Sequence, residues 1–241
     1  MKIKNATALV TGANRGIGRA IVKALLDSGV KKVYACARDT DKLKEVVALD
    51  SKRVIALKLD VVDQSLINAV VQAAPDVNIL FNNAGVLEFG GILEVSHEKI
   101  VRQFNTNFYG KLNMARAFAP VIEKNGGGAI INTLTLVALA SMPGLSTYNA
   151  SKAAAWSMTQ SLRAGLAGKS IEVYGVFPGA VDTDMLAGVE MPKTSPADIA
   201  SAVIAGIESG NEDIFPDPMS TQLYAAWKQD HKAVEKQFAT M

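Results

Sequence analysis

The first regular unit of the chain reads Thr7-Ala8-Leu9-Val10-Thr11-Gly12-Ala13-Asn14-Arg15-Gly16-Ile17-Gly18. Its first four residues have the length and apolar character of a buried strand, and a glycine-rich turn follows. Beyond the turn, apolar residues recur in steps of three and four, which predicts an amphipathic helix. These residues are Ile17, Ala20, Ile21, Ala24 and Leu25. The unit is therefore a strand, a tight turn and a helix in direct succession.

The same alternation of short apolar runs and longer amphipathic stretches continues along most of the chain. The expected strands are Thr7–Val10, Lys32–Cys36, Val54–Leu59, Asn78–Phe81, Ala129–Thr133 and Ile171–Phe177. The other expected helices are Asp41–Leu49, Gln64–Ala73, Ser96–Lys124, Tyr148–Ala167 and one that starts at Ser195-Pro196. Several of the strands lack polar alternation, as strands buried on both faces do. The pattern predicts an α/β fold with a single Rossmann-type, doubly wound parallel sheet and helices on both faces.

Length and composition fit one domain that spans residues 1–241. Two segments depart from the alternation: about 185–195, expected to be a loop over the substrate, and about 219–239, expected to be a helical C-terminal segment. A formal charge of +2 gives no electrostatic footprint for nucleic acid or a membrane surface, and no apolar run could span a bilayer. One cysteine, two histidines and no recognisable leader favour a reducing, cytoplasmic setting without a metal site.

The glycine-rich turn has the properties of a phosphate-binding loop. Glycines let the backbone turn tightly and approach a pyrophosphate, and the following helix presents unpaired N–H groups and the positive end of its dipole. The spacing is G-x-x-x-G-x-G and not the commoner G-x-G-x-x-G, so a strand-to-helix turn without a ligand is the alternative. The candidate cofactor contacts in this turn are Gly12, Asn14, Arg15, Gly16, Ile17 and Gly18.

The end of the second expected strand indicates which nucleotide binds. A carboxylate at this place accepts hydrogen bonds from the adenosine ribose and selects NAD. Ala37 stands there instead, Arg38 follows it, and Arg15 lies in the turn. Two guanidinium groups can hold a 2′-phosphate, so the pair favours NADP(H). The alternatives are a ribose contact by Asp39, or arginines that only pair with Asp39 or Asp41.

Four short motifs follow one another on this α/β pattern. They are Thr11-Gly12-x-x-x-Gly16-x-Gly18, Asn82-Asn83-Ala84-Gly85, Tyr148-x-x-x-Lys152 and Pro178-Gly179. With these motifs in this order, the chain resembles the short-chain dehydrogenase/reductases from about residue 5 to about residue 185. The resemblance implies an enzyme that moves a hydride between NADP(H) and a small carbonyl or alcohol substrate. It also implies association as a homodimer or homotetramer through the long helices.

The resemblance implies that Tyr148 is the acid–base group and that Lys152 tunes it and binds the nicotinamide ribose. The chemistry agrees, because a carbonyl that receives a hydride needs a proton donor, and a free phenol with a pKa of ~10 is poorly matched to neutral pH. Lys152 lies one helical turn beyond Tyr148 on the same face, where its ammonium would favour the phenolate.

Two further positions complete the expected catalytic set. Where the family has a serine before the tyrosine, this chain has Thr135, whose hydroxyl can still donate to the substrate oxygen but whose methyl group takes up pocket volume. Asn107 matches a family asparagine that holds a water for proton relay from the lysine. The alternative for Asn107 is a buried helix residue satisfied by backbone groups.

The remaining expected contacts follow the later strands, at the carboxyl ends where open α/β sheets bind ligands. The cofactor contacts among them are Asp60, Val61, Asn83, Ala84, Gly85, Pro178, Gly179, Val181 and Thr183. The expected substrate wall is apolar and comprises Leu136, Val137, Leu145, Met185 and Leu186. Two other functions fit the same fold: a non-catalytic NADP-sensing or scaffold protein, suggested by the missing serine, and an NAD-linked alcohol or sugar dehydrogenase.

Overall fold

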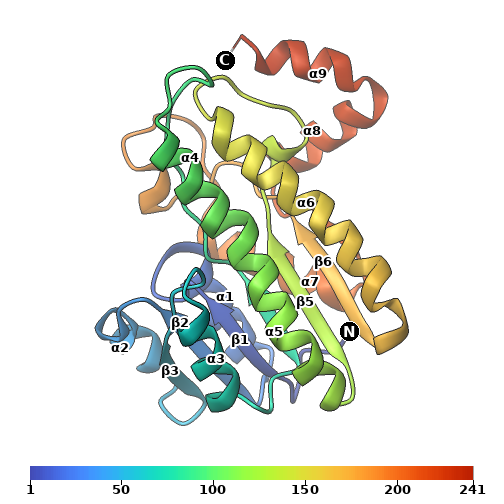
Figure 1. Cartoon of the computed structure of the whole chain (residues 1–241). Coiled ribbons are helices and arrows are strands. Elements are labelled where there is room, and N and C mark those ends of the chain that lie inside the picture. The colour runs from blue at the N-terminus through green and yellow to red at the C-terminus, as the bar shows by residue number, and fades with distance from the viewer. Residues whose placement is uncertain (241) are drawn as a thin grey trace.

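The structure is a computed structural model that describes residues 1–240. Within these residues, seven parallel strands form one sheet in the order β3-β2-β1-β4-β5-β6-β7 (Figure 1). The strands are β1 (Thr7–Thr11), β2 (Lys32–Ala37), β3 (Val54–Lys58), β4 (Ile79–Asn82), β5 (Gly128–Thr133), β6 (Ile171–Val176) and β7 (Asp213–Ile214). The strand order reverses between β1 and β4, and a doubly wound sheet opens its ligand crevice at such a point. The predicted fold class is confirmed.

Helices cover both faces of the sheet (Figure 1). Those on one face are α1 (Gly16–Asp27), α2 (Lys44–Val47) and α7 (Pro196–Glu208). Those on the other face are α3 (Gln64–Ala73), α5 (Lys111–Lys124) and α6 (Ser146–Leu166). Successive strand residues enter opposite cores, so that Ala8 and Val10 pack against the first group of helices and Leu9 packs against the second. Burial on both faces is the reason why the strands read as continuous apolar runs.

The six predicted strands agree with the observed ones to within one residue at each end. The short strand β7 is not predicted by the sequence, because two residues are too few to establish a periodicity. The predicted helix that starts at Ser195-Pro196 is α7, with Ser195 as its N-cap and its hydroxyl accepting from the Asp198 N–H.

The long helix predicted over Ser96–Lys124 has an irregular middle. It consists of α4 (His97–Phe104), a π-helical turn (Asn105–Gly110) and α5. A Cβ on Gly110 would lie 2.7 Å from Cγ2 of Val61, so the turn passes very close to the segment after β3. Such turns are frequent at functional sites, and this one carries Asn107.

The C-terminal segment forms two helices, α8 (Pro218–Gln229) and α9 (His231–Phe238). Both lie above the carboxyl ends of the strands, at the end of the molecule opposite to the N-terminus (Figure 1). Asp217 caps α8 and Asp230 caps α9, each through its side-chain oxygen. None of the helices within residues 1–240 has the length and apolar character needed to cross a membrane.

Two glycines provide a matched test of the first turn. A Cβ on Gly18 would lie 2.1 Å from the Gly12 carbonyl oxygen, so Gly18→Ala forces the backbone apart and should lower the melting temperature by several degrees. Gly165 is exposed in α6 with nothing within 4 Å of an added Cβ, so Gly165→Ala should stabilise by about 0.5–1 kcal/mol. Thermal melts followed by circular dichroism compare them. Equal melting temperatures would contradict the close approach at Gly18.

Candidate active site

A cavity of about 1880 Å³ opens at the carboxyl ends of the strands. It is larger than the ~300–1,000 Å³ of an ordinary ligand pocket, which fits a dinucleotide and a second molecule together. The predicted substrate wall lines it, as do Thr135, Tyr148, Lys152 and all the predicted cofactor contacts except Gly18. Gly18 is buried beneath the turn, where its missing side chain allows close packing against Gly12 and Asn83. The structure thus gives Gly18 a packing role, and its direct contact with the cofactor stays a prediction.

The glycine turn has the geometry that a pyrophosphate requires. Gly12 and Gly16 have φ angles of +63° and +52°, in the left-handed region that favours glycine. Helix α1 begins at Gly16 with Arg15 as its N-cap, and the Arg15 side chain makes no capping hydrogen bond. The first N–H groups of α1 are thus directed at the cavity without a side-chain cap, which suits an anionic ligand. The residues present fit a dinucleotide.

The adenosine end of the cavity has cationic side chains, and β2 ends without a carboxylate. Ala37 ends β2, and the exposed Arg38 follows it into the cavity lining. The Asp39 carboxylate accepts a hydrogen bond from the Asp41 N–H at 3.0 Å and caps the turn that follows. This bond occupies Oδ1 and leaves Oδ2 exposed, so a ribose contact by Asp39 stays the alternative. Lys42, which the sequence analysis missed, also lines this end.

Arg15 pairs with a residue that its sequence position does not indicate. Its Nη1 lies 2.6 Å from Oδ2 of Asp184, and both side chains are exposed. The alternative partner Asp41 instead pairs with Lys44 at 3.0 Å. An exposed ion pair contributes at most about 1 kcal/mol, so a ligand phosphate can compete for the Arg15 guanidinium.

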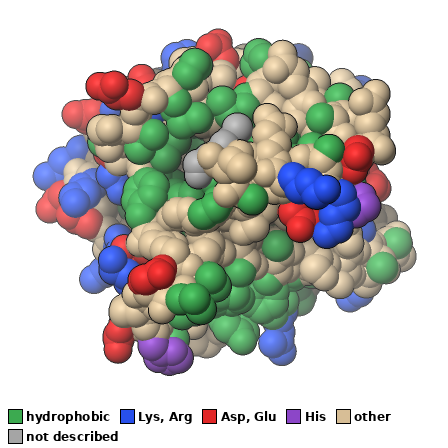
Figure 2. Space-filling view, turned by 90° about the horizontal axis from the view of Figure 1, so that it is seen from above, with side chains coloured by type: hydrophobic (Ala, Val, Ile, Leu, Met, Phe, Trp, Pro, Cys, Tyr) green, Lys and Arg blue, Asp and Glu red, His purple; other side chains and the backbone are tan. Residues whose placement is uncertain are grey.

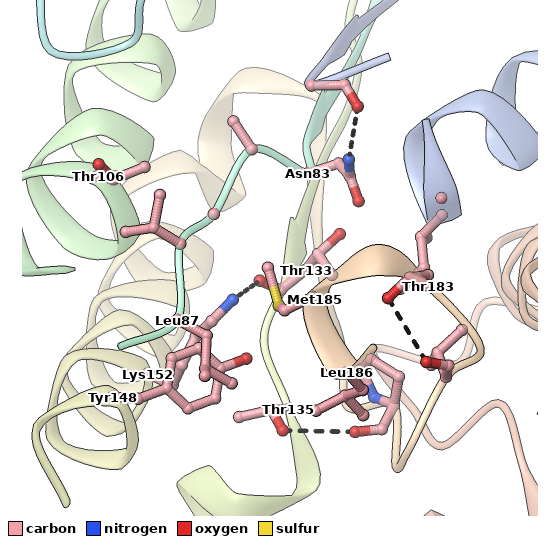
Figure 3. A pocket seen from close by; sticks show the side chains of 18 of the residues that line it. Asn83, Leu87, Thr106, Thr133, Thr135, Tyr148, Lys152, Thr183, Met185 and Leu186 are labelled. Atoms are coloured by element: carbon pink, nitrogen blue, oxygen red, sulfur yellow. Dashed lines mark hydrogen bonds between the residues drawn. The ribbon is translucent and has the colours of Figure 1, made fainter. Parts of the chain in front are cut away.

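Three hydroxyl- and amine-bearing side chains meet at the opposite end of the cavity (Figure 3). Tyr148 and Lys152 project from the buried face of α6, with the Lys152 Nζ 5.6 Å from the centre of the Tyr148 ring. The Lys152 Nζ donates to the Thr133 carbonyl at 2.9 Å. Thr135, just after β5, lies beside Tyr148, and its hydroxyl donates to the Pro178 carbonyl at 3.4 Å. The cavity therefore brings the predicted acid, lysine and hydroxyl together.

Burial dominates the protonation of this group. It raises the pKa of Tyr148 to about 12, and the Thr135 hydroxyl opposes this increase. It lowers the pKa of Lys152 to about 7. Burial is therefore the larger influence on the phenol of Tyr148, and the tuning of its pKa by Lys152 stays a prediction. Tyr148 consequently keeps its proton at neutral pH.

Asn107 lies behind the cavity wall. Its Oδ1 accepts from the Val86 N–H at 2.9 Å, while its Nδ2 donates to the Val86 carbonyl at 2.9 Å and to Ser151 Oγ at 3.0 Å. The side chain thus matches the alternative of a buried helix residue satisfied within the protein. It holds the Gly85–Val86 backbone beside Lys152, and a role in holding water stays a prediction.

Lys111 is a functional candidate that the sequence analysis missed. It is 2% exposed, and its Nζ donates to the carbonyls of Asn82 and Ala84. Burial, together with the nearby charge of Lys152, holds the pKa of Lys111 well below its ordinary value. Lys111 supports the Asn82–Gly85 turn from beneath. The sequence did contain a signal for this residue, because Lys111 lies at helical spacing on the same buried face as Met114, Ala115 and Phe118.

Asp217 was also missed, because its partner Gly179 is distant in sequence. The side chain is 4% exposed, and its Oδ2 accepts from the Gly179 N–H at 2.8 Å. Its Oδ1 accepts from the Ser220 N–H at 2.8 Å at the start of α8. One carboxylate therefore joins the Pro178-Gly179 motif to the C-terminal helices.

Comparisons with known proteins agree with this site. The short chain dehydrogenase family model matches residues 6–193. A 3alpha-hydroxysteroid dehydrogenase of Mediterraneibacter gnavus is 32% identical over 197 residues, which are 78% of this chain and 79% of that protein. A short-chain dehydrogenase from Burkholderia cenocepacia, solved in complex with NADP, is 35% identical with a TM-score of 0.93 and covers 99% of both chains. A Burkholderia phymatum relative solved with NAD is 26% identical with a TM-score of 0.84, over 98% of this chain and 96% of that one.

The chain therefore belongs to the short-chain dehydrogenase/reductase family. It is an oxidoreductase that acts on alcohol or ketone groups.

The buried lysine predicts a pH-dependent stability. Below about pH 7, Lys152 is charged in the folded protein, and the burial of this charge lowers the free energy of unfolding. Between about pH 7 and the ordinary lysine pKa of ~10.4, Lys152 is neutral in the folded protein but still protonated in the unfolded chain. The unfolded state then binds more protons, so stability rises with pH in this window. Lys152→Met should thus raise the melting temperature more at about pH 6 than at about pH 9.5. The control is the exposed Lys52→Met; a pH-independent gain for Lys152→Met would contradict the assignment.

Proposed function

We propose that this protein is an NADP(H)-dependent oxidoreductase that reduces a small ketone or aldehyde and catalyses the reverse alcohol oxidation. The observation that carries the proposal is the convergence of Tyr148, Lys152 and Thr135 in the cavity that begins at the glycine turn. A phosphate cradle and a proton donor at two ends of one cavity suit hydride transfer from a dinucleotide. A protein that only senses NADP would not need a proton donor at the end of the cavity opposite to the glycine turn.

The residues that would hold the cofactor come from several strand ends. The turn at Gly12 to Ile17 and the start of α1 suit the pyrophosphate, and Asn83, Ala84 and Gly85 follow β4 on the ribose side. Val181 and Thr183 suit the carboxamide, as the family resemblance implies. When bound, the nicotinamide supplies a hydride to the carbonyl carbon or takes one from the alcohol.

The chain's own residues would handle the proton. The Tyr148 hydroxyl is protonated at neutral pH and would donate its proton to the substrate oxygen as negative charge develops there. The Thr135 hydroxyl would donate a hydrogen bond to the same oxygen. Lys152, while charged, stabilises the phenolate left on Tyr148 and can hold a ribose hydroxyl. The buried surroundings strengthen each of these interactions by excluding water.

Preference for NADP(H) over NAD(H) is supported by the charges at the adenosine end. Arg15, Arg38 and Lys42 are cations in the cavity lining, Ala37 replaces a carboxylate, and Asp39 is engaged by the Asp41 N–H. A structure solved with NADP and one solved with NAD both share this fold. The fold alone therefore does not decide the preference, and we assign it to these residues. A homodimer or homotetramer in a reducing, cytoplasmic setting completes the proposal.

Tyr148→Phe tests the acid. The phenyl ring keeps its packing but has no proton to donate, so turnover of a ketone with NADPH should fall by ~10²-fold or more, while the Kd for NADPH changes little. Steady-state kinetics and fluorescence titration of NADPH measure both quantities. Most of the turnover surviving in this variant would exclude Tyr148 as the acid. Tight NADPH binding without turnover in the parent protein would favour the sensor function.

The cofactor preference has its own test. NADPH should bind the parent protein more tightly than NADH, and Ala37→Asp combined with Arg38→Ala should invert this order, because a carboxylate repels the 2′-phosphate but accepts from ribose hydroxyls. Lys31→Ala, an exposed cation outside the cavity, is the control. Tighter binding of NADH by the parent protein would disprove the preference.

A further inference from the structure

We propose that the substrate is a bulky, uncharged ketone whose apolar substituent packs against the C-terminal helices α8 and α9. This inference rests on the proposed reductase function and specifies its substrate class. The inference is based on the observation that side chains of α8 and α9 line the same cavity as Tyr148 and Thr135.

One wall of the substrate end belongs to a hydrophobic cluster that contains the acid itself. Tyr148, Leu136 and Val137 pack in it with Val234 and Phe238 of α9. Phe238 is 6% exposed and lines the cavity, whereas Val234 is 2% exposed and lies behind the lining. Met219 and Leu223 extend this wall along α8. A substituent on the carbonyl carbon would therefore meet aliphatic and aromatic groups.

Helix α8 is a fixed wall. The Asp217 carboxylate joins its first turn to Gly179, as described above. A row of aromatic rings also connects it to the sheet: Phe177 stacks on Phe215 at 4.9 Å between ring centres, and Phe215 stacks on Tyr224 at 4.0 Å. Helix α8 thus presents its apolar side chains in place before a substrate arrives.

The facing wall is apolar and adaptable. Met185, Leu186, Val189 and Met191 line it from the loop that follows β6, and Met185 and Leu186 lie across from Tyr148 and Thr135 in Figure 3. Met185 and Met191 are both about two-fifths exposed, at 41% and 40%. In the view from above, hydrophobic side chains gather on this face of the molecule in several groups (Figure 2). Methionines fill irregular space and contact aromatic rings favourably, which suits substituents of varied shape.

The charges at this end argue against an anionic substrate. Most charged side chains of the lining lie along the cofactor half, on the glycine turn and after β2 and β3. Of the cations elsewhere in the described lining, Lys152 is assigned to catalysis, and Arg102 pairs with Glu88 at 2.6 Å. His97 lies on the exposed first turn of α4. The polar side chains that line the cavity from α8 and α9 are the amides of Gln222 and Gln237, so a carboxylate there would lose its hydration without gaining a cationic partner.

A substrate series tests the class. With saturating NADPH, kcat/KM should rise roughly fourfold for each methylene from 2-butanone to 2-heptanone, the value of one buried CH₂. The methyl ester of a 4-oxo acid should exceed the free acid by about tenfold or more. A flat series with measurable turnover, or a preference for the free acid, would overturn the inference and leave the reductase function standing. NADPH binding without turnover of any ketone would overturn both.

Two variants of α9 locate the effect. Phe238→Ala should reduce kcat/KM for 2-heptanone about tenfold more than for 2-butanone, because only the longer chain reaches the ring. Val234→Ala removes volume from the same cluster behind the lining and should reduce both substrates by one common factor. Circular dichroism confirms that each variant is folded. If Phe238→Ala also reduced kcat/KM for 2-heptanone and 2-butanone by the same factor, α9 would only support the fold, and the inference would be overturned.

Discussion

The seam between β1 and β4 is the contact on which the rest of the site depends. Asn83 Nδ2 donates to the carbonyls of Thr11 and Gly12 at 3.1 and 3.3 Å, and the Ala84 N–H donates to Thr11 Oγ1 at 2.9 Å. Thr11 Oγ1 in turn donates to the Phe81 carbonyl at 3.2 Å. These bonds join the glycine turn to the Asn83–Gly85 segment, which passes beside Lys152. The glycine turn and the region around Tyr148 and Lys152 are therefore held in one rigid frame. Such a frame is needed to position a cofactor against a substrate.

Two buried lysines give this frame an electrostatic character. Lys111 beneath the Asn82–Gly85 turn and Lys152 beside it are both almost fully buried, and both donate to backbone carbonyls. Neither has a carboxylate partner among the described residues. Such an arrangement costs folding stability, and under the proposed function the two charges would favour an anionic cofactor and a developing oxyanion.

Sequence reasoning recovered what is local and missed what depends on distant partners. Strand bounds and the relation of Tyr148 to Lys152 follow from short-range periodicity, and the structure agrees with them. The pairing of Arg15 with Asp184 joins residues far apart in the chain, and no periodicity reveals it. The satisfied side chain of Asn107 likewise depends on Val86 and on the next helix, so only the fold could show it.

The aromatic row beside α8 gives the protein an optical reporter. Both tryptophans of the chain belong to this region, and the rings of Trp156 and Trp227 lie 6.0 Å apart at 70°. Trp156 belongs to α6, which carries Tyr148, and Trp227 belongs to α8, so the tryptophan fluorescence of the chain arises at the junction of these two helices. Intrinsic emission therefore reports on the docking of α8 against α6, without any attached label.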